Sequence, residues 1–222
     1  MTIQAIFWDY DNTILATAEA HWQKHQSVLA RQGIKLHDNY RHRVYENNGQ
    51  QNWQWLKEEL GLVFTEKEYL QAIDLEFGQF LQNLQMRPGV EKLLNLADQK
   101  SIPQAIVTNA RKASAKPVLD AKNITTRMQF ILYKEDYQGR KPNPLPYLSA
   151  LAKMATFLKQ PLDPKRCLII EDDPKGVESA HKAGAIVIQR KISESAQESP
   201  YANYCCYHEA DFIKTVENLL NC

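Results

Sequence analysis

The chain has 222 residues, which is long enough to bury one large hydrophobic core or a core with an inserted subdomain. Its 27 basic and 26 acidic residues give a formal charge of +1, so no global field points to nucleic acid or to an anionic membrane surface. No apolar run approaches the roughly 18 residues of a membrane span, and the N-terminal region lacks a secretory pattern. We therefore expect a soluble cytoplasmic protein that binds neither nucleic acid nor membranes; its oligomeric state stays open.

Short apolar runs along the chain have the length and composition of buried strands. They cover residues 3–9, 102–108, 130–133, 167–172 and 185–189. Helical patterns between or after them cover residues 88–100, 144–158, 174–185 and 208–220. This alternation predicts an α/β fold with a Rossmann-like parallel sheet covered on both faces.

One interval breaks the alternation of strands and helices. Residues 16–85 carry only helical signals, with glycine turns at Gly33, Gly49 and Gly61. We expect an all-α subdomain inserted between the first strand and the rest of the sheet. The predicted organisation is therefore an α/β core domain formed by residues 1–15 and 86–222, with a helical subdomain over residues 16–85.

Polar residues follow four of the predicted strands. In chain order they are Asp9 and Asp11; Thr108 and Asn109; Lys141; and Glu171, Asp172 and Asp173. Ligands of open parallel sheets bind at the carboxyl ends of the strands, where these groups would meet. Two acids beside an apolar strand cost free energy unless a cation or donors compensate them. The combination favours Mg²⁺ and an anionic substrate, and a carboxylate beside such a metal can carry a phosphoryl group as an aspartyl-phosphate.

The segments DYDNT, VTNA, RKP and EDDPKG, in this order and at strand ends, resemble the four motifs of the haloacid dehalogenase-like hydrolase superfamily. The stretch DYDNTILATAEAHWQKHQSVLARQGI also resembles the opening of its β-phosphoglucomutase and phosphoglycolate phosphatase branch. In that branch a helical cap is inserted at this same point. The resemblance implies that residues 16–85 are such a cap.

The resemblance also implies roles for individual residues. Asp9 would be the nucleophile, and Asp11 the general acid that later activates water. Thr108 and Lys141 would hold the transferring phosphoryl group. Backbone N–H groups of the DYDNT turn would add an anion-binding nest, so that the phosphate site comprises Asp9, Tyr10, Asp11, Thr108, Asn109 and Lys141. The implied ligands of Mg²⁺ are the Asp9 carboxylate, the Asp11 backbone carbonyl and Asp172. Glu171 would either bind the ion directly or contact one of its ligands.

Two motif residues have structural interpretations. Asn12 stands where the family usually has glycine, and asparagine tolerates the left-handed backbone that such a turn requires. Asp173 is expected to cap the helix that starts near Pro174, because acids favour helix N-termini.

The reaction type can be narrowed from the motifs. Relatives that resemble haloacid dehalogenases or phosphonatases lack an acid two residues after the nucleophile, whereas Asp11 is present here. Phosphate ester chemistry is therefore favoured. β-Phosphoglucomutases have basic residues on both sides of the cap glycine, but Asn48 and Asn52 flank Gly49 in this chain, which argues against a mutase unless Arg43 or Arg111 compensates.

The candidate substrate residues are His21, Asn48, Gly49 and Arg111. We expect a Mg²⁺-dependent phosphatase that hydrolyses a small phosphorylated metabolite through an aspartyl-phosphate. The sequence does not choose among a sugar phosphate, phosphoglycolate, a nucleotide or a phosphorylated protein side chain. A phosphomutase and a catalytically silent binding protein of the same fold stay open as alternatives. A phospho-accepting receiver domain does not fit, since its acidic pair and acceptor aspartate come before the hydroxyl and the lysine, whereas here an acidic cluster comes last. A receiver domain also has no helical insertion of about 70 residues.

Overall fold

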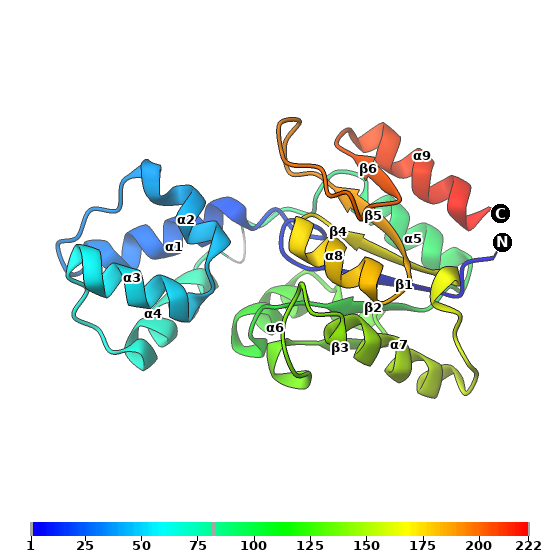
Figure 1. The fold of residues 1–222 in the computed structure, drawn as a ribbon, viewed down its shortest axis with the longest axis horizontal. Coiled ribbons are helices and arrows are strands. Elements are labelled where there is room, and N and C mark those ends of the chain that lie inside the picture. Colours follow the sequence, from blue (N-terminus) through cyan, green and yellow to red (C-terminus); the bar gives the residue numbers. More distant parts are fainter. Residues whose placement is uncertain (1, 81–82, 222) are drawn as a thin grey trace. The chain divides into compact units, whose positions relative to one another are not determined.

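The computed structural model describes residues 2–80 and 83–221 of the chain. The contacts divide the chain into two compact units, one formed by Met1–Ala16 and Gln85–Cys222 and the other by Thr17–Leu84. Figure 1 shows that the first unit contains the sheet, and that the regular elements described in the second unit are helices. We call them the α/β unit and the helical unit.

The α/β unit is built on a parallel sheet whose described strands have the order β3-β2-β1-β4-β5-β6. Their bounds are Ala5–Trp8 (β1), Gln104–Val107 (β2), Phe130–Leu132 (β3), Cys167–Glu171 (β4), Ile186–Arg190 (β5) and Tyr204–Cys206 (β6). The strand β1 lies at the centre, where Phe7 pairs with Ala105 of β2 and with Ile169 of β4. The carboxyl ends of β1, β2 and β4 therefore meet at one edge of the sheet.

One face of the sheet packs against α7 (Leu145–Leu158) and α8 (Pro174–Lys182). Phe7 of β1 shares this core with Tyr147 of α7 and Val177 of α8, and all three side chains are fully buried. Successive side chains of a strand point to opposite faces, so the neighbours of Phe7 must be covered from the other side.

The other face of the sheet packs against α5 (Val90–Gln99), which in turn contacts α9 (Glu209–Leu220). The indole N–H of Trp8 donates to Gln104 Oε1 at 3.0 Å, and Gln104 Nε2 donates to the Leu94 carbonyl of α5 at 3.4 Å. Both faces of the sheet are thus covered, as the apolar strand pattern predicts. The remaining helix of this unit, α6 (Lys112–Ala121), follows β2.

The helical unit contains α1 (Ala18–Ala30), α2 (Arg41–Glu46), α3 (Gly49–Leu60) and α4 (Glu66–Gly78). Its core joins Trp22, Trp55 and Tyr69 with aliphatic side chains of all four helices. The helices α3 and α4 begin with capping boxes on Asn48 and Thr65, in which the cap side chain accepts from the N3 backbone N–H and the N3 side chain accepts from the backbone N–H of the cap residue. The glycine Gly61 ends α3 with a left-handed φ of 74°.

The predicted α/β fold with a Rossmann-like parallel sheet is confirmed, and each predicted strand is present within one residue at its C-terminal end. Among the α-helices and strands described in the α/β unit, the helix α6 and the edge strand β6 were not predicted. The helical pattern of residues 66–84 forms a helix only as far as Gly78, and residues 81 and 82 lie outside the described part. Within residues 2–80 and 83–221, no helix has both the length and the apolar character needed to cross a bilayer.

Candidate active site

The predicted site residues of the α/β unit lie where β1, β2 and β4 end. Asp9 follows β1 directly, and its N–H donates to the Ile170 carbonyl of β4 at 2.9 Å. Thr108 follows β2, and its N–H donates to the Leu132 carbonyl of β3 at 3.0 Å. Glu171 is the last residue of β4. Ordinary sheet pairing therefore brings together groups that are far apart in the sequence.

Lys141 lies at the centre of this arrangement and is almost fully buried. Its ammonium donates to Asp9 Oδ1 at 2.6 Å, to Glu171 Oε1 at 2.5 Å and to the Val107 carbonyl at 2.8 Å. A lysine has three N–H donors, and these three acceptors use all of them. Burial lowers the pKa of Lys141, but the charges of Asp9 and Glu171 outweigh it and hold the pKa well above its ordinary range.

Glu171 is the most enclosed of the acids, with 1% of its surface exposed. Its Oε1 accepts from Lys141 and also from the hydroxyl of Tyr147, at 2.5 Å. Burial keeps the pKa of the Tyr147 hydroxyl well above its ordinary value, so this group stays protonated and donates. A Cβ added to Gly176 of α8 would lie within 2.3 Å of both carboxylate oxygens of Glu171.

Asp172 is held by side chains from two other segments. The hydroxyl of Thr13 donates to Asp172 Oδ1 at 3.3 Å, and Gln189 Nε2 of β5 donates to the Asp172 carbonyl at 3.2 Å. The next residue, Asp173, accepts from the Lys175 N–H at 2.6 Å as the N-cap of α8. The predicted helix-cap role of Asp173 is thus confirmed.

The acidic residues Asp9, Glu171 and Asp172 fit a hard divalent cation. Each can offer a carboxylate oxygen within 4.8 Å of the others. Burial raises the pKa of Asp9 to about 6 and that of Glu171 to about 8, and burial together with the neighbouring acids raises the pKa of Asp172. Lys141 compensates one of these three negative charges, so the cluster lacks the two positive charges that a divalent cation carries. Oxygen ligands of this kind suit Mg²⁺.

Thr108 and Asn109 are fixed by hydrogen bonds within their own loop region. The hydroxyl of Tyr137 donates to the Thr108 carbonyl at 2.5 Å and lies 3.2 Å from Asn109 Oδ1, while the Lys141 N–H donates to the same oxygen at 3.3 Å. The Thr108 hydroxyl oxygen accepts from the Ala110 N–H at 2.9 Å. The segment after β2 is thereby joined to the segment that carries Lys141.

The turn after β1 has the geometry that its sequence predicts. Asn12 has a φ of 53°, so the left-handed conformation expected of this asparagine is confirmed. The N–H of Ile14 donates to the Tyr10 carbonyl at 3.1 Å, and the half-buried Asp11 pairs with Leu15 in an isolated bridge.

Arg87 supports this turn from a distant part of the chain. Its guanidinium donates to the Asn12 carbonyl at 2.6 Å, to the Arg190 carbonyl at 2.8 Å and to the Lys191 carbonyl at 2.7 Å. Sequence reasoning missed Arg87, Tyr137 and Tyr147, because their partners are identified only by the fold. Thr13 could have been found, since it lies inside the DYDNT motif.

The candidate substrate residues of the helical unit have structural partners there. The His21 ring stacks on Phe77, with 4.5 Å between ring centroids. Asn48 is the N-cap of α3, and a Cβ added to Gly49 would lie 2.6 Å from Leu70 Cδ2 of α4. Arg111, the fourth candidate, is in the α/β unit, half-buried at the start of α6.

The residues considered for binding a second phosphate, Asn52 and Arg43, also form hydrogen bonds within the helical unit. Asn52 is buried; its amide donates to the Val44 carbonyl at 2.9 Å, and its oxygen accepts from the Trp55 indole at 2.8 Å. Arg43 forms two hydrogen bonds of 2.7 and 2.6 Å to Glu59.

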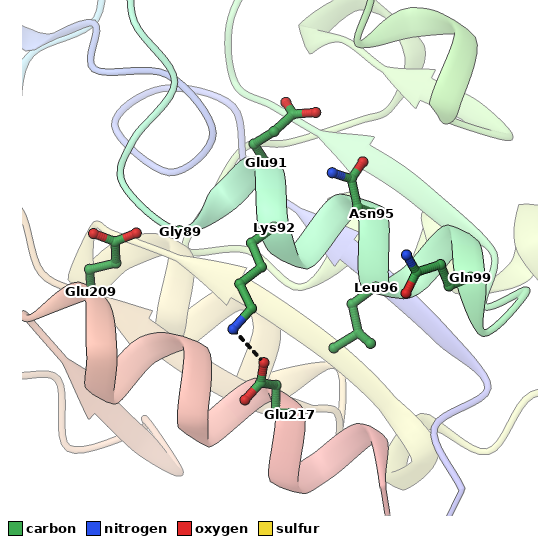
Figure 2. Close-up of a pocket in the computed structure, with 8 residues that line it drawn as sticks. All are labelled: Gly89, Glu91, Lys92, Asn95, Leu96, Gln99, Glu209 and Glu217. Atoms are coloured by element: carbon green, nitrogen blue, oxygen red, sulfur yellow. Dashed lines mark ion pairs between the residues drawn. The ribbon is translucent and has the colours of Figure 1, made fainter.

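A hollow of about 580 Å³ elsewhere in the α/β unit lies between α5 and α9 (Figure 2). Lys92 of α5 and Glu217 of α9 point toward one another across it and form an ion pair of 2.8 Å. None of the predicted site residues lines this hollow, so it is distinct from the acidic cluster.

Known proteins resemble this chain over most of its length. The family described as "Haloacid dehalogenase-like hydrolase" matches residues 6–189. The N-acetylmuramic acid 6-phosphate phosphatase of Pseudomonas aeruginosa is 27% identical over 186 residues, covering 83% of this chain and 80% of that protein. The protein CbbY of Rhodobacter capsulatus is 25% identical over 199 residues, covering 85% of each chain. The crystal structure of CbbY from Rhodobacter sphaeroides in complex with phosphate superposes with a TM-score of 0.83 at 20% identity, covering 95% of this chain and 96% of that one.

Proposed function

We propose that this chain, which belongs to the haloacid dehalogenase-like hydrolase family, is a Mg²⁺-dependent phosphatase that hydrolyses a phosphomonoester through an aspartyl-phosphate. The observation that carries the proposal is the contact of 2.6 Å between Asp9 and the Lys141 ammonium inside a buried acidic cluster. A carboxylate whose charge is balanced in this way is ready to attack an electrophilic phosphorus.

The relatives support a small phosphorylated metabolite as the substrate. One of them is an N-acetylmuramic acid 6-phosphate phosphatase, and the crystal structure of CbbY holds phosphate. Both proteins match this chain over most of its length. We infer that this chain also acts on a phosphate ester, while its leaving group is a question for experiment.

The first half of the proposed reaction transfers the phosphoryl group to the protein. A carboxylate oxygen of Asp9 attacks phosphorus in line with the leaving oxygen, and the bond from phosphorus to that oxygen breaks. Asp11 donates its proton to the leaving oxygen. The hydroxyl of Thr108 donates a hydrogen bond to an equatorial phosphoryl oxygen, where negative charge accumulates, and Lys141 does the same by exchanging one of its three present acceptors for phosphate.

The second half returns the protein to its starting state. Asp11, now ionised, takes a proton from a water molecule, and the resulting hydroxide attacks the phosphorus of the aspartyl-phosphate. The acyl-phosphate bond breaks, so that inorganic phosphate leaves and the Asp9 carboxylate is restored. The same acid thus serves both halves in opposite protonation states.

The carboxylates of Asp9 and Asp172 and the backbone carbonyl of Asp11 would hold Mg²⁺, with Glu171 beside them. When bound, Mg²⁺ supplies positive charge to the phosphoryl oxygens. Burial raises the pKa values of Asp9 and Glu171, and a bound cation would favour the ionised form of both carboxylates. The Thr13 hydroxyl and the Gln189 amide keep Asp172 in place.

A phosphatase fits better than a mutase that must also bind a second phosphate. A mutase of the related branch needs cations next to the cap glycine, whereas Asn52 is buried and satisfied within the helical unit and Arg43 is paired with Glu59. We propose that the helical unit acts as the cap, and that its residues select the leaving group.

The test is phosphate release from a panel of phosphomonoesters that includes a generic aryl phosphate, with Mg²⁺ or with EDTA. Wild type should release phosphate only with Mg²⁺, and Asp9→Asn should release none while keeping its melting temperature. A wild-type protein that is silent on the whole panel would contradict the proposal and favour a mutase or a binding protein.

A further inference from the structure

The hydroxyl of Tyr147 and the ammonium of Lys141 bind the same oxygen of Glu171. Tyr147 lies on α7 and is fully buried, and its hydroxyl lies 2.5 Å from Glu171 Oε1. Lys141 lies 2.5 Å from that oxygen, and its ammonium is 4.8 Å from the centroid of the Tyr147 ring. One tyrosine therefore contacts both members of the Glu171–Lys141 ion pair.

We propose that Tyr147 is a positioning residue, which holds the Glu171 carboxylate where it can orient Lys141 on Asp9. The inference rests on the proposed phosphatase function and adds a residue to its site. Tyr147 does not touch the reacting atoms in this role; it acts on them through Glu171 and Lys141.

Glu171 needs such a restraint because its carboxylate has competing partners. It lies close to Asp9 and Asp172 and can offer an oxygen to the same cation. The hydroxyl of Tyr147 keeps Oε1 on the side of Lys141, and Gly176 leaves room for the carboxylate on the side of α8. With the hydroxyl gone, the carboxylate is free to turn toward the cation and away from the lysine.

Lys141 depends on Glu171 in the same way. The lysine stem is flexible, so the ammonium is placed by its acceptors, which are Asp9, Glu171 and the Val107 carbonyl. If Glu171 turns away, the ammonium keeps only Asp9 and the Val107 carbonyl as acceptors and shifts from the place where the phosphoryl oxygens gain charge. This weakens an interaction that strengthens in the transition state, so kcat should fall more than KM rises.

The decisive variant is Tyr147→Phe, which keeps the ring and removes only the hydroxyl. We expect kcat to fall about tenfold with KM changed less than about twofold, since a hydrogen bond to a charged group is lost but no substrate contact is. The dissociation constant for Mg²⁺ alone, measured by titration calorimetry, should fall, since Glu171 is then free to turn toward the cation; a weaker affinity for Mg²⁺ would overturn the inference.

The matched control is Tyr69→Phe in the helical unit. It also removes a buried tyrosine hydroxyl, which lies 2.6 Å from His25 Nδ1. Both variants should lose a similar amount of stability, but only Tyr147→Phe should lose kcat. An unchanged kcat in Tyr147→Phe would overturn the inference, as would an equal fall of kcat in both variants.

A double-mutant cycle with Glu171→Gln tests whether Tyr147 acts through Glu171. Adding Tyr147→Phe to Glu171→Gln should cause little further loss of kcat, whereas fully additive losses would contradict the inference. The ¹⁵Nζ resonance of Lys141, recorded without substrate, gives a readout that does not depend on turnover. It should shift or broaden in Tyr147→Phe but not in Tyr69→Phe, even if the proposed phosphatase activity is absent; an unchanged resonance would overturn the inference.

Discussion

A Cβ atom added to Gly176 would lie 2.2 Å from the carboxyl carbon of Glu171. Such a distance is far shorter than any contact between non-bonded carbon atoms. Glu171 has little freedom to move away, because its Oε1 is bonded to Lys141 and Tyr147. The first turn of α8 therefore has to be glycine at this position for the acidic cluster to keep its arrangement.

The first prediction is that Gly176→Ala displaces Glu171 and so disturbs Lys141. We expect activity to fall by about tenfold or more and the free energy of unfolding by about 1–3 kcal/mol, the usual cost of overpacking a core. The control is Gly78→Ala, because nothing lies within 4 Å of a Cβ at that position. Chemical denaturation and steady-state kinetics check both variants; normal activity in Gly176→Ala would contradict the close packing described above.

The second prediction concerns pH and the metal. The pKa of Asp9 is raised from 3.8 to about 6, and that of Glu171 from 4.5 to about 8, chiefly by burial. The folded protein therefore holds these protons more tightly than the unfolded chain does. Without metal, stability should fall as pH rises from about 4 to 8, because folding then requires uncompensated buried carboxylates. Lys141 does not reverse this sign, since its pKa lies above that window.

Bound Mg²⁺ should relieve this cost by compensating the ionised carboxylates. The gain in melting temperature caused by Mg²⁺ should thus be larger near pH 8 than near pH 5. Scanning calorimetry in Mg²⁺ and in EDTA at both pH values measures it, and Asp172→Asn should lose most of the gain. A gain that is equal at both pH values would contradict a metal site at this cluster.

The third prediction separates a substrate role of Asn48 from its role as a helix cap. Asn48→Ala should lower the free energy of unfolding by about 1 kcal/mol, because it removes the N-cap of α3. Thr65→Ala removes the equivalent cap of α4 and should cost about the same. If Asn48 is only a cap, KM is unchanged in both variants; a rise in KM confined to Asn48→Ala would instead support the predicted substrate contact.

The fourth prediction is that Tyr137→Phe weakens phosphate binding. Its hydroxyl holds the Thr108 carbonyl and lies near Asn109, two residues proposed to bind the phosphoryl group. Inhibition by inorganic phosphate should weaken about threefold to tenfold, and KM should rise in step. Competitive inhibition assays measure the effect, and unchanged inhibition would contradict the proposed support of Thr108.

The strands and motifs could be predicted because their signals are local. An apolar run that ends in acids, as at Asp9 or Glu171, indicates a strand and predicts that its carboxyl end is functional. Four such signals in order also predicted the family, which the match over residues 6–189 confirms. The roles of the individual site residues remain predictions for the experiments above.

What could not be predicted depends on contacts distant in sequence. The bond from Tyr147 to Glu171 joins residues 24 positions apart, and the bond from Arg87 to Asn12 joins residues 75 positions apart. The sequence around Tyr147 or Arg87 does not indicate which distant residue either side chain contacts. The strand β6 is short and half exposed at the sheet edge, and α6 contains Pro117, so their sequence signals are weak.

The most direct test of the central claim is to trap the phosphorylated nucleophile. The wild-type protein is quenched during turnover with Mg²⁺ and its best phosphomonoester, treated with borohydride, digested and examined by mass spectrometry. Borohydride reduces an aspartyl-phosphate to homoserine, so we predict homoserine at position 9 and unmodified Asp11. Turnover that leaves Asp9 unreduced, or that places homoserine at another aspartate, would contradict Asp9 as the nucleophile.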